Sequence, residues 1–214
     1  MTATLETRFH ALWHCMIGTD RSREGFGILD AANASSARIY HSWSHIAALL
    51  RELDKVRGIP EFAQVAFDEV ELAIFFHDAI YVPGREDNES KSAALLLNLA
   101  TGNSALGEDP LTLVVQLIEA TAAHDPSHDM ATRLMTDLDL SILGAPPDIY
   151  AAYVSGVRQE YRRFADDLWI RGRRAALDGF LARQRIYQTA HFYGLLEHAA
   201  RANLMTERQQ LSRI

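Results

Sequence analysis

A nearly continuous apolar run, from Val70 to Phe76, constrains the fold of this chain more than any other feature. A helix made of such residues has no polar face, so it must be buried on most sides by other elements. The run is far shorter than the ~18 residues that a membrane-spanning helix requires. It therefore predicts a helix in the interior of a globular protein, and this helix ends at the polar dipeptide His77-Asp78.

Most of the remaining chain is patterned as amphipathic helices. Apolar residues recur at helical spacing from Leu5 to Met16, and Gly18 marks the end of that segment. Residues 19–27 read as a loop, and further helices are expected over 28–37, from Ser42 or Ser44 to about Val56, and over 89–100, 110–124, 130–138, 149–164, 173–187 and 189–203. No clear strand-like alternation separates them. We expect an all-α fold of about eight to ten helices, as a single compact multi-helix bundle.

Length, charge and cysteine content limit the partners. A chain of 214 residues suits one domain, 1–214, and is short for two. The net charge of -7 argues against a sequence-independent grip on nucleic acid, which needs a basic face. No apolar run could span a membrane, and the N-terminus lacks the shape of a signal peptide. The single cysteine, Cys15, excludes an intramolecular disulfide. We expect a cytoplasmic protein with no nucleic-acid or membrane partner, and a homodimer stays open.

Two acidic segments lie in apolar surroundings and carry the candidate chemistry. Burying His77 and Asp78 is costly without partners, although the dipeptide could also simply cap the helix before it. Asp137 and Asp139 lie beside leucines, and N-capping or turn formation explains them equally well. Together with His45 these residues supply imidazoles and carboxylates from three separate segments. Such a mixed nitrogen and oxygen set suits Mn²⁺, Fe²⁺, Co²⁺, Ni²⁺ or Zn²⁺.

Histidine pairs four residues apart do not identify the site by themselves. His41 and His45 have this spacing in YHSWSHI, in what looks like the first turn of a helix, but so do His10 and His14, and His124 and His128. Only other residues that converge on one pair can distinguish it. We interpret His10 and His14 as structural.

The chain resembles the HD-domain metal-dependent phosphohydrolases in the order of its motifs and in the sequences around them. The motifs are a histidine in YHSWSHI, His-Asp in FFHDAIY and a distant aspartate in DLDLSILG. The likeness is closer to an uncharacterised bacterial branch of predicted metal-dependent HD phosphohydrolases, and it includes RIYHSWSHI, DNESKSA, TAAH, VRQEY and RQRIYQTAHF. It covers the chain from about 38 to 207.

The resemblance implies a helical fold in which His45, His77, Asp78 and Asp139 bind one divalent metal ion: Mn, Ni, Co, Fe or Zn, with Mg as a further option. The metal-site core would span about 38–145, with helices over 148–207 packing on it. Asp139 is preferred to Asp137 because the family's acid precedes the LSILG run, yet the two stay alternatives. The extra histidines of binuclear relatives are not all evident, which favours one metal.

Other residues are candidates for supporting roles. His41 would lie behind the ligands or face the substrate. His124 ends a predicted helix, where it could cap that helix or line the pocket. Glu89 begins another helix, where a carboxylate favours the positive end of the helix dipole, or it could act as a general base near the metal. The cations considered for neutralising a phosphate are Arg38, Lys91, Arg158 and Arg185.

The resemblance therefore predicts a metal-dependent hydrolase of a phosphate ester or phosphoanhydride. The substrate class comes from the resemblance and not from a phosphate-binding loop, since the chain has no GxxxxGK[ST] sequence. The substrate would be a nucleotide or another small phosphorylated metabolite. The catalytic candidates are Asp78, Glu89, His41 and His124. A non-catalytic nucleotide sensor with the same metal and pocket is the main alternative, and a di-iron oxygenase would need more histidine ligands.

Overall fold

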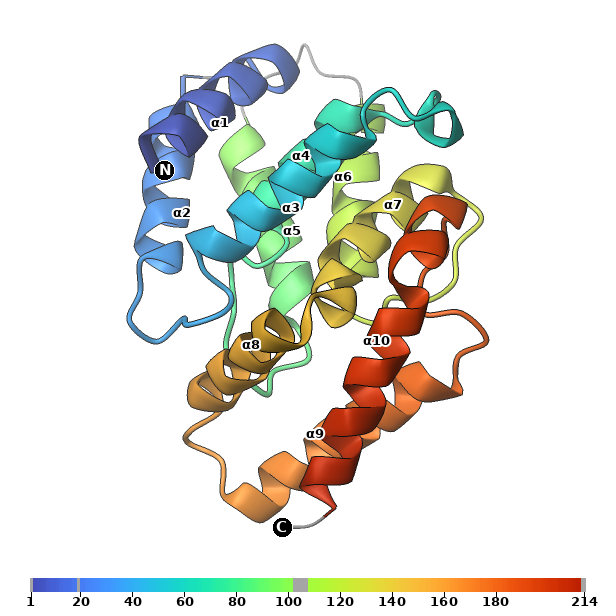
Figure 1. The fold of residues 1–214 in the computed structure, drawn as a ribbon. Helices are drawn as coiled ribbons and strands as arrows, with labels where there is room; N and C mark the ends of the chain where they lie inside the picture. Colours follow the sequence, from blue (N-terminus) through green and yellow to red (C-terminus); the bar gives the residue numbers. More distant parts are fainter. Residues whose placement is uncertain (1, 19, 102–107, 213–214) are drawn as a thin grey trace.

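The computed structural model describes residues 2–18, 20–101 and 108–212, and the fold it shows there is all-α, as predicted (Figure 1). This part of the chain contains helices and no strand. The helices are α1 (Thr2–Met16), α2 (Ser22–Asn33), α3 (Trp43–Val56), α4 (Phe67–Phe76), α5 (Asn88–Ala100), α6 (Glu108–Ala120), α7 (Met130–Asp139), α8 (Pro147–Glu160), α9 (Asp166–Ala182) and α10 (Ala190–Leu211), with short 3-10 helices η1 (Pro60–Phe62) and η2 (Leu140–Gly144).

Helix α4 lies in the core, as its apolar sequence predicts. Every residue from Val70 to Phe76 is buried, and Phe75 packs edge-on against Phe9 of α1, with ring centroids 5.3 Å apart. The helix contacts α1, α3, α5, α6 and α7. Among the described residues, no helix is both long and apolar enough to cross a membrane. The burial of α4 brings the dipeptide at its C-terminal end, His77-Asp78, to the middle of the bundle.

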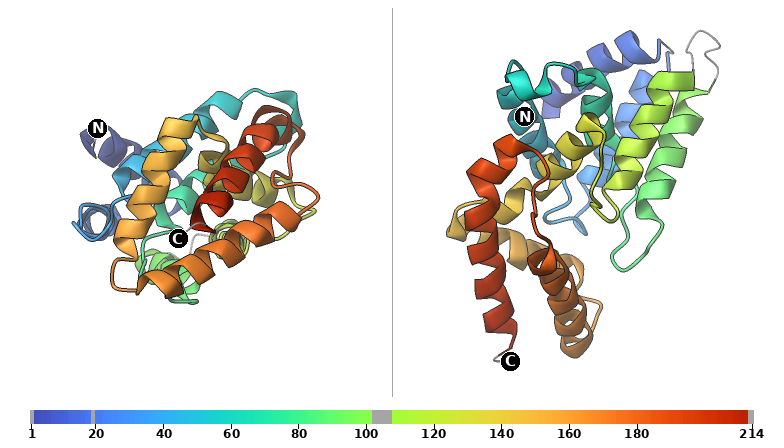
Figure 2. Two further views of the ribbon diagram at one scale, coloured as in Figure 1. Left: turned by 60° about the horizontal axis from the view of Figure 1, so that its bottom comes forward. Right: turned by 90° about the vertical axis from the view of Figure 1, so that its right-hand side faces the viewer.

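The C-terminal helices form the opposite end of the molecule. Helix α10 packs along η2 and α9, and α9 and α10 project together away from the N-terminal helices (Figure 2). The contact with η2 is close because a Cβ atom added to Gly144 would lie 2.6 Å from Cβ of Leu196. Helix α10 is thereby fixed directly behind the end of α7, from which Asp139 extends.

Several helix boundaries differ from the sequence prediction, including the C-terminal end of α10, which lies at Leu211 instead of 203. Helix α2 begins at Ser22 and ends at Asn33, so most of the expected loop is helical, because Phe26 and Leu29 are buried in the core. Helix α9 spans Asp166–Ala182 instead of 173–187. The segment after it leaves helical geometry because its backbone binds other elements: the Gln188 and Thr189 N–H groups each donate to the Asp137 carboxylate at 2.8 Å. Helix α6 ends at Ala120, four residues earlier than expected.

Candidate metal centre

Three ligand-type side chains from separate helices meet in the interior. His45 lies in the first turn of α3, His77 directly follows α4, and Asp139 is the last residue of α7. His45 Nε2 lies 3.2 Å from His77 Nε2 and 3.1 Å from Asp139 Oδ1. The ligand atoms of the three residues all lie within 4.8 Å of one another, so this group could hold a metal ion. Helix α4 contacts both α3 and α7, which explains why the three residues converge.

The protonation of His77 supports a cation at this place. Its Nδ1–H donates to the Ile74 carbonyl at 2.9 Å, so Nε2 of the neutral ring carries a lone pair. That nitrogen faces Asp78 Oδ2 at 3.1 Å and Asp139 Oδ1 at 3.6 Å, which also present lone pairs. These lone pairs repel one another unless a proton or a metal cation lies between them and attracts all three atoms.

The pKa values of His77 and Asp139 and the distances between the ligand atoms also favour a cation at this place. Burial opposes a charge on the His77 ring, but the Asp78 and Asp139 carboxylates outweigh it and hold the pKa of His77 well above its usual range. Burial likewise opposes ionisation of Asp139, but hydrogen bonds from His124, His45 and His77 keep its pKa well below the usual value. Atoms that share one transition metal, at bond lengths of about 2.0–2.2 Å, lie roughly 3.0–3.5 Å apart. The donor set therefore fits a borderline divalent cation.

Asp78 lies at the edge of this group. Its Oδ2 is 3.1 Å from His77 Nε2 and 3.9 Å from His45 Nε2, and its side chain is 11% exposed. Arg38 holds the backbone here, because its guanidinium donates to the carbonyls of Asp78 and Ala79 at 2.7 and 3.0 Å. The fourth-ligand role predicted for Asp78 is compatible with this position and stays a prediction.

The structure separates the two aspartates that the sequence left as alternatives. Asp139 faces the histidines, whereas Asp137 points to the segment before α10, where its carboxylate accepts from Gln188 N, Thr189 N and Thr189 Oγ1. Burial outweighs these hydrogen bonds and raises the pKa of Asp137 to about 6. Asp137 therefore organises the loop before α10 and does not belong to the group that could hold a metal ion.

His124 contacts this group through Asp139. Its Nε2 lies 2.7 Å from Asp139 Oδ2, while its backbone N–H donates to the Ala120 carbonyl and so also closes the end of α6. The residue has φ +52°, the only positive φ of a non-glycine among the described residues. Arg183 supports this sparsely populated conformation by donating to the carbonyls of Ala123 and His124 at 2.8 and 2.5 Å. His124 thus orients the second oxygen of Asp139.

His41 does not share the first helical turn with His45, as the spacing suggested. Helix α3 begins only at Trp43, because the Glu160 carboxylate holds the preceding turn open. Its Oε1 accepts the N–H groups of Ile39, Tyr40 and His41 at 2.7, 2.8 and 3.0 Å. Its Oε2 lies 2.6 Å from His41 Nδ1. The rings of His41 and His45 have centroids 6.0 Å apart, so His41 lies beside the candidate ligands.

Glu160 is the site residue that sequence reasoning missed. Its carboxylate side chain is completely buried, although it belongs to VRQEY, one of the motifs that carry the family resemblance. A glutamate at the end of a helix reads as solvated surface. The only sequence signal for Glu160 was its position next to a tyrosine within that motif. The turn that it binds lies 120 residues away along the chain, so local sequence could not connect the two.

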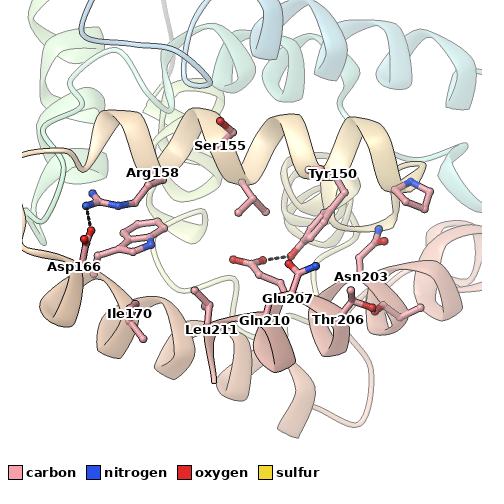
Figure 3. Close-up of a pocket in the computed structure, with 15 residues that line it drawn as sticks. Tyr150, Ser155, Arg158, Asp166, Ile170, Asn203, Thr206, Glu207, Gln210 and Leu211 are labelled. Atoms are coloured by element: carbon pink, nitrogen blue, oxygen red, sulfur yellow. Dashed lines mark hydrogen bonds and ion pairs between the residues drawn. The ribbon is translucent and has the colours of Figure 1, made fainter. Parts of the chain in front are cut away.

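The other predicted supporting residues lie apart from this group. Glu89 is partly buried in the first turn of α5, and no hydrogen bond or ion pair within the described chain joins it to the three residues, so its role stays a prediction. Lys91 pairs with Asp87 at 2.8 Å. Arg158 pairs with Asp166, at one end of a cavity of about 720 Å³ between α8, α9 and α10 (Figure 3). None of the predicted metal or catalytic residues lines that cavity.

We expect His45→Ala to lose metal and thermal stability together, whereas His14→Ala should keep both. The first change removes a buried donor atom, and a ligand that binds only the folded state stabilises it. His14 is exposed on α1 and serves as the matched control. Elemental analysis of the purified variants, with thermal unfolding in the presence and absence of chelator, measures both effects. If His14→Ala lost the metal and His45→Ala kept it, the assignment of the centre to α3 would be wrong.

In comparisons with known proteins, no family model, no curated protein and no solved structure matches this chain.

Proposed function

We propose that the protein is a metal-dependent phosphohydrolase that acts on a phosphate ester or phosphoanhydride of a small metabolite, with nucleotides as the first candidates. The observation that carries this proposal is the group of His45, His77 and Asp139, whose two histidines are buried, flanked by a third histidine, His41, that a carboxylate orients. The motif order shared with the HD-domain phosphohydrolases supports the substrate class. The same resemblance supports one divalent ion, Mn, Ni, Co, Fe or Zn, with Mg as an alternative.

His45, His77 and Asp139 would hold the ion, with Asp78 as the fourth ligand. A divalent cation there supplies Lewis-acid polarisation of the phosphoryl oxygens and lowers the pKa of water. Asp78, at the edge of the group, is placed to accept a hydrogen bond from the attacking water and so to orient it. His124 keeps Asp139 in position through Oδ2, 2.7 Å away.

His41 is the proton-transfer residue in this proposal. Its Nδ1–H donates to Glu160 Oε2 at 2.6 Å, which leaves Nε2 free to give or take a proton. Burial lowers the pKa of the ring, but the nearby Asp78 carboxylate and the hydrogen bond to Glu160 outweigh it, so the pKa of His41 is raised. A histidine that is protonated more readily suits a general acid that protonates the leaving oxygen.

A neighbouring cavity offers room for the organic part of such a substrate. It has a volume of about 610 Å³, and its lining includes His45, Tyr40 and Tyr153 together with aliphatic residues of α8 and α10. Its only charged lining residues, Glu52 and Lys55, pair with each other at 2.7 Å. A mostly apolar wall next to a candidate ligand suits a ring or chain attached to the phosphate.

The test is phosphate release from nucleoside mono-, di- and triphosphates and from a chromogenic phosphate ester. Metal-free protein is reloaded with Mn²⁺, Co²⁺, Ni²⁺, Zn²⁺ or Mg²⁺ in turn. We expect turnover of at least one substrate that chelator abolishes and a reloaded metal restores. Tight nucleotide binding without turnover under any metal would replace the hydrolase with the sensor alternative. A protein that takes up none of these metals would contradict both.

Glu160→Gln should reduce turnover while the metal stays bound. The glutamine carbonyl can still accept the three backbone N–H groups, but its NH2 group, a donor, then faces His41 Nδ1 in place of the acceptor Oε2, and the charge is gone. We expect kcat to fall by roughly 10- to 100-fold, the size typical of residues that orient a catalytic or ligating group. Glu207→Gln is the matched control, since Glu207 is a buried carboxylate bonded to Tyr150 (Figure 3) and to Arg173.

The control should leave kcat unchanged even if it lowers stability. Metal content and the pH profile of kcat are measured on both variants, because a purely structural role for Glu160 would lower the amount of folded protein without shifting the profile. An unchanged profile and unchanged kcat in Glu160→Gln would exclude a positioning role.

A further inference from the structure

A second cavity beside the metal centre is lined by cations. Its volume is about 500 Å³, and its lining comprises His124, Pro126, Ser127, His128, Arg133, Arg183, Gln184, Arg185, Ile186 and Gln188. Three arginines and two histidines therefore face a space whose lining contains no aspartate or glutamate. This is unexpected in a chain with a net charge of -7, in which 28 acidic residues outnumber 21 lysines and arginines. The local charge favours an anionic ligand.

Hydrogen bonds to neutral backbone carbonyls hold the walls of this cavity in place, so the positive charges of the arginines are not neutralised. Arg183 donates to the carbonyls of Ala123 and His124, and Arg133 Nε donates to the Ser127 carbonyl at 2.5 Å. Gln188 joins the two walls, because its Oε1 accepts from Ser127 N at 2.7 Å and its Nε2 donates to the Asp125 carbonyl at 3.1 Å. Arg133 and Arg183 are therefore positioned before any ligand binds, which reduces the entropic cost of binding.

Donor groups on these arginines remain available. Within the described chain, Arg133, Arg183 and Arg185 take part in no ion pair, and neither terminal nitrogen of Arg133 makes a hydrogen bond. Arg185 only stacks its guanidinium over the Tyr193 ring, 4.2 Å from the centroid. Asp129 follows His128 in the sequence, but its carboxylate caps the start of α7, where it accepts hydrogen bonds from Thr132 N and Oγ1. Free guanidinium groups bind phosphate through paired N–H donors.

His124 connects the cavity to the candidate metal ligands. His124 lines the cavity, and its Nε2 lies 2.7 Å from Asp139 Oδ2, while Asp139 Oδ1 is 3.1 Å from His45 Nε2. One side chain thus separates the basic cavity from the group that could hold a metal ion. In a phosphoanhydride the two phosphate groups are joined by one bridging oxygen, so a ligand with two phosphates presents a second anionic group beside the first.

We propose that this cavity is an anion subsite, built by Arg133, Arg185 and the anchored Arg183, that binds a second phosphate group of the substrate next to the one that reacts. The anion site itself stands on the cavity alone. Its part in turnover rests on the proposed hydrolase function, and it narrows the substrate class to phosphoanhydrides and bisphosphorylated metabolites over simple monoesters.

Binding of inorganic pyrophosphate to metal-free protein tests the site independently of catalysis. Titration calorimetry is run on wild type, Arg185→Gln, the double variant Arg133→Gln/Arg185→Gln, and Arg23→Gln. Arg23 is the control because it is an exposed arginine on α2 that makes no ion pair within the described chain. We expect Kd to rise about tenfold or more in the double variant, less in Arg185→Gln, and not at all in the control. Thermal unfolding without ligand checks that each variant is folded.

No binding to wild type, or equal binding to wild type and both site variants, would overturn the anion site. Arg185→Gln keeps the test decisive if the double variant does not fold, because the Arg185 side chain is exposed and makes no hydrogen bond within the described residues.

The second arm uses metal-loaded protein. KM for a nucleoside diphosphate should rise about tenfold or more in the double variant and by a smaller factor in Arg185→Gln, with little change in kcat, while KM for the chromogenic monoester should stay unchanged. An equal rise for both substrates would contradict the assignment of the cavity to a second phosphate. If no substrate is turned over at all, the proposed hydrolase fails, and the pyrophosphate titration still decides whether the anion site exists.

Discussion

Asp139→Asn is expected to empty the metal centre, whereas the same change at Asp137 should leave the metal bound. Both residues are acids at the end of α7, two positions apart, so the pair is closely matched. Asp139 presents Oδ1 to His45 and Oδ2 to His124, and an amide there removes the charge that offsets the cation. Metal affinity should fall by roughly 100-fold or more, since even residues that only bond to a ligand contribute 10- to 100-fold.

Asp137→Asn should instead lower the stability of the fold. Its carboxylate accepts three hydrogen bonds from Gln188 and Thr189, and an asparagine at this place can leave a buried donor without an acceptor. We expect a loss of about 1–3 kcal/mol in the free energy of unfolding. Elemental analysis, metal titration and denaturant unfolding on both variants measure the contrast. Metal lost from Asp137→Asn but kept by Asp139→Asn would reverse the assignment.

Asp78→Asn should have the largest effect on turnover. In the proposed mechanism this carboxylate would help to hold the cation and would accept a hydrogen bond from the attacking water. Its Oδ2 lies 3.1 Å from His77 Nε2, and the His77, His41 and His45 rings hold its pKa well below the usual range against the opposing effect of burial. A neutral amide weakens all of these interactions. At saturating metal, kcat should fall by roughly two orders of magnitude or more.

Asp87→Asn provides the control for Asp78→Asn. Asp87 is a nearby acid that pairs with Arg85 and Lys91 on the surface, so its replacement should change neither metal content nor kcat. Saturating metal separates lost binding from lost catalysis. A fully loaded Asp78→Asn protein with wild-type turnover would exclude the role proposed for this carboxylate.

Much of the helical architecture follows from local sequence. The run from Val70 to Phe76 required a buried helix, and the chain formed one that ends where His77 begins. Burial of such a helix can be predicted from sequence because all of its faces are apolar, so it must be buried whichever way it is oriented. The boundaries of α2 and α9 were wrong for the opposite reason. Tertiary contacts of Phe26 and of the backbone at Gln188 decide where helical geometry starts or stops there.

The sequence by itself determined that this protein is all-helical and that His77-Asp78 lies at the end of its most apolar segment, because helical periodicity and the cost of burying charge act within a few residues. Only the tertiary structure decided that Asp139 and not Asp137 joins His45 and His77, and that Glu160 orients His41 across 119 residues of chain. Two acids two positions apart on a helix point to different sides, and the elements packed around the helix decide which of them meets the histidines. The convergence of Arg133 and Arg185 on one cavity has the same origin: the loop after α9 meets the start of α7 only in the folded chain.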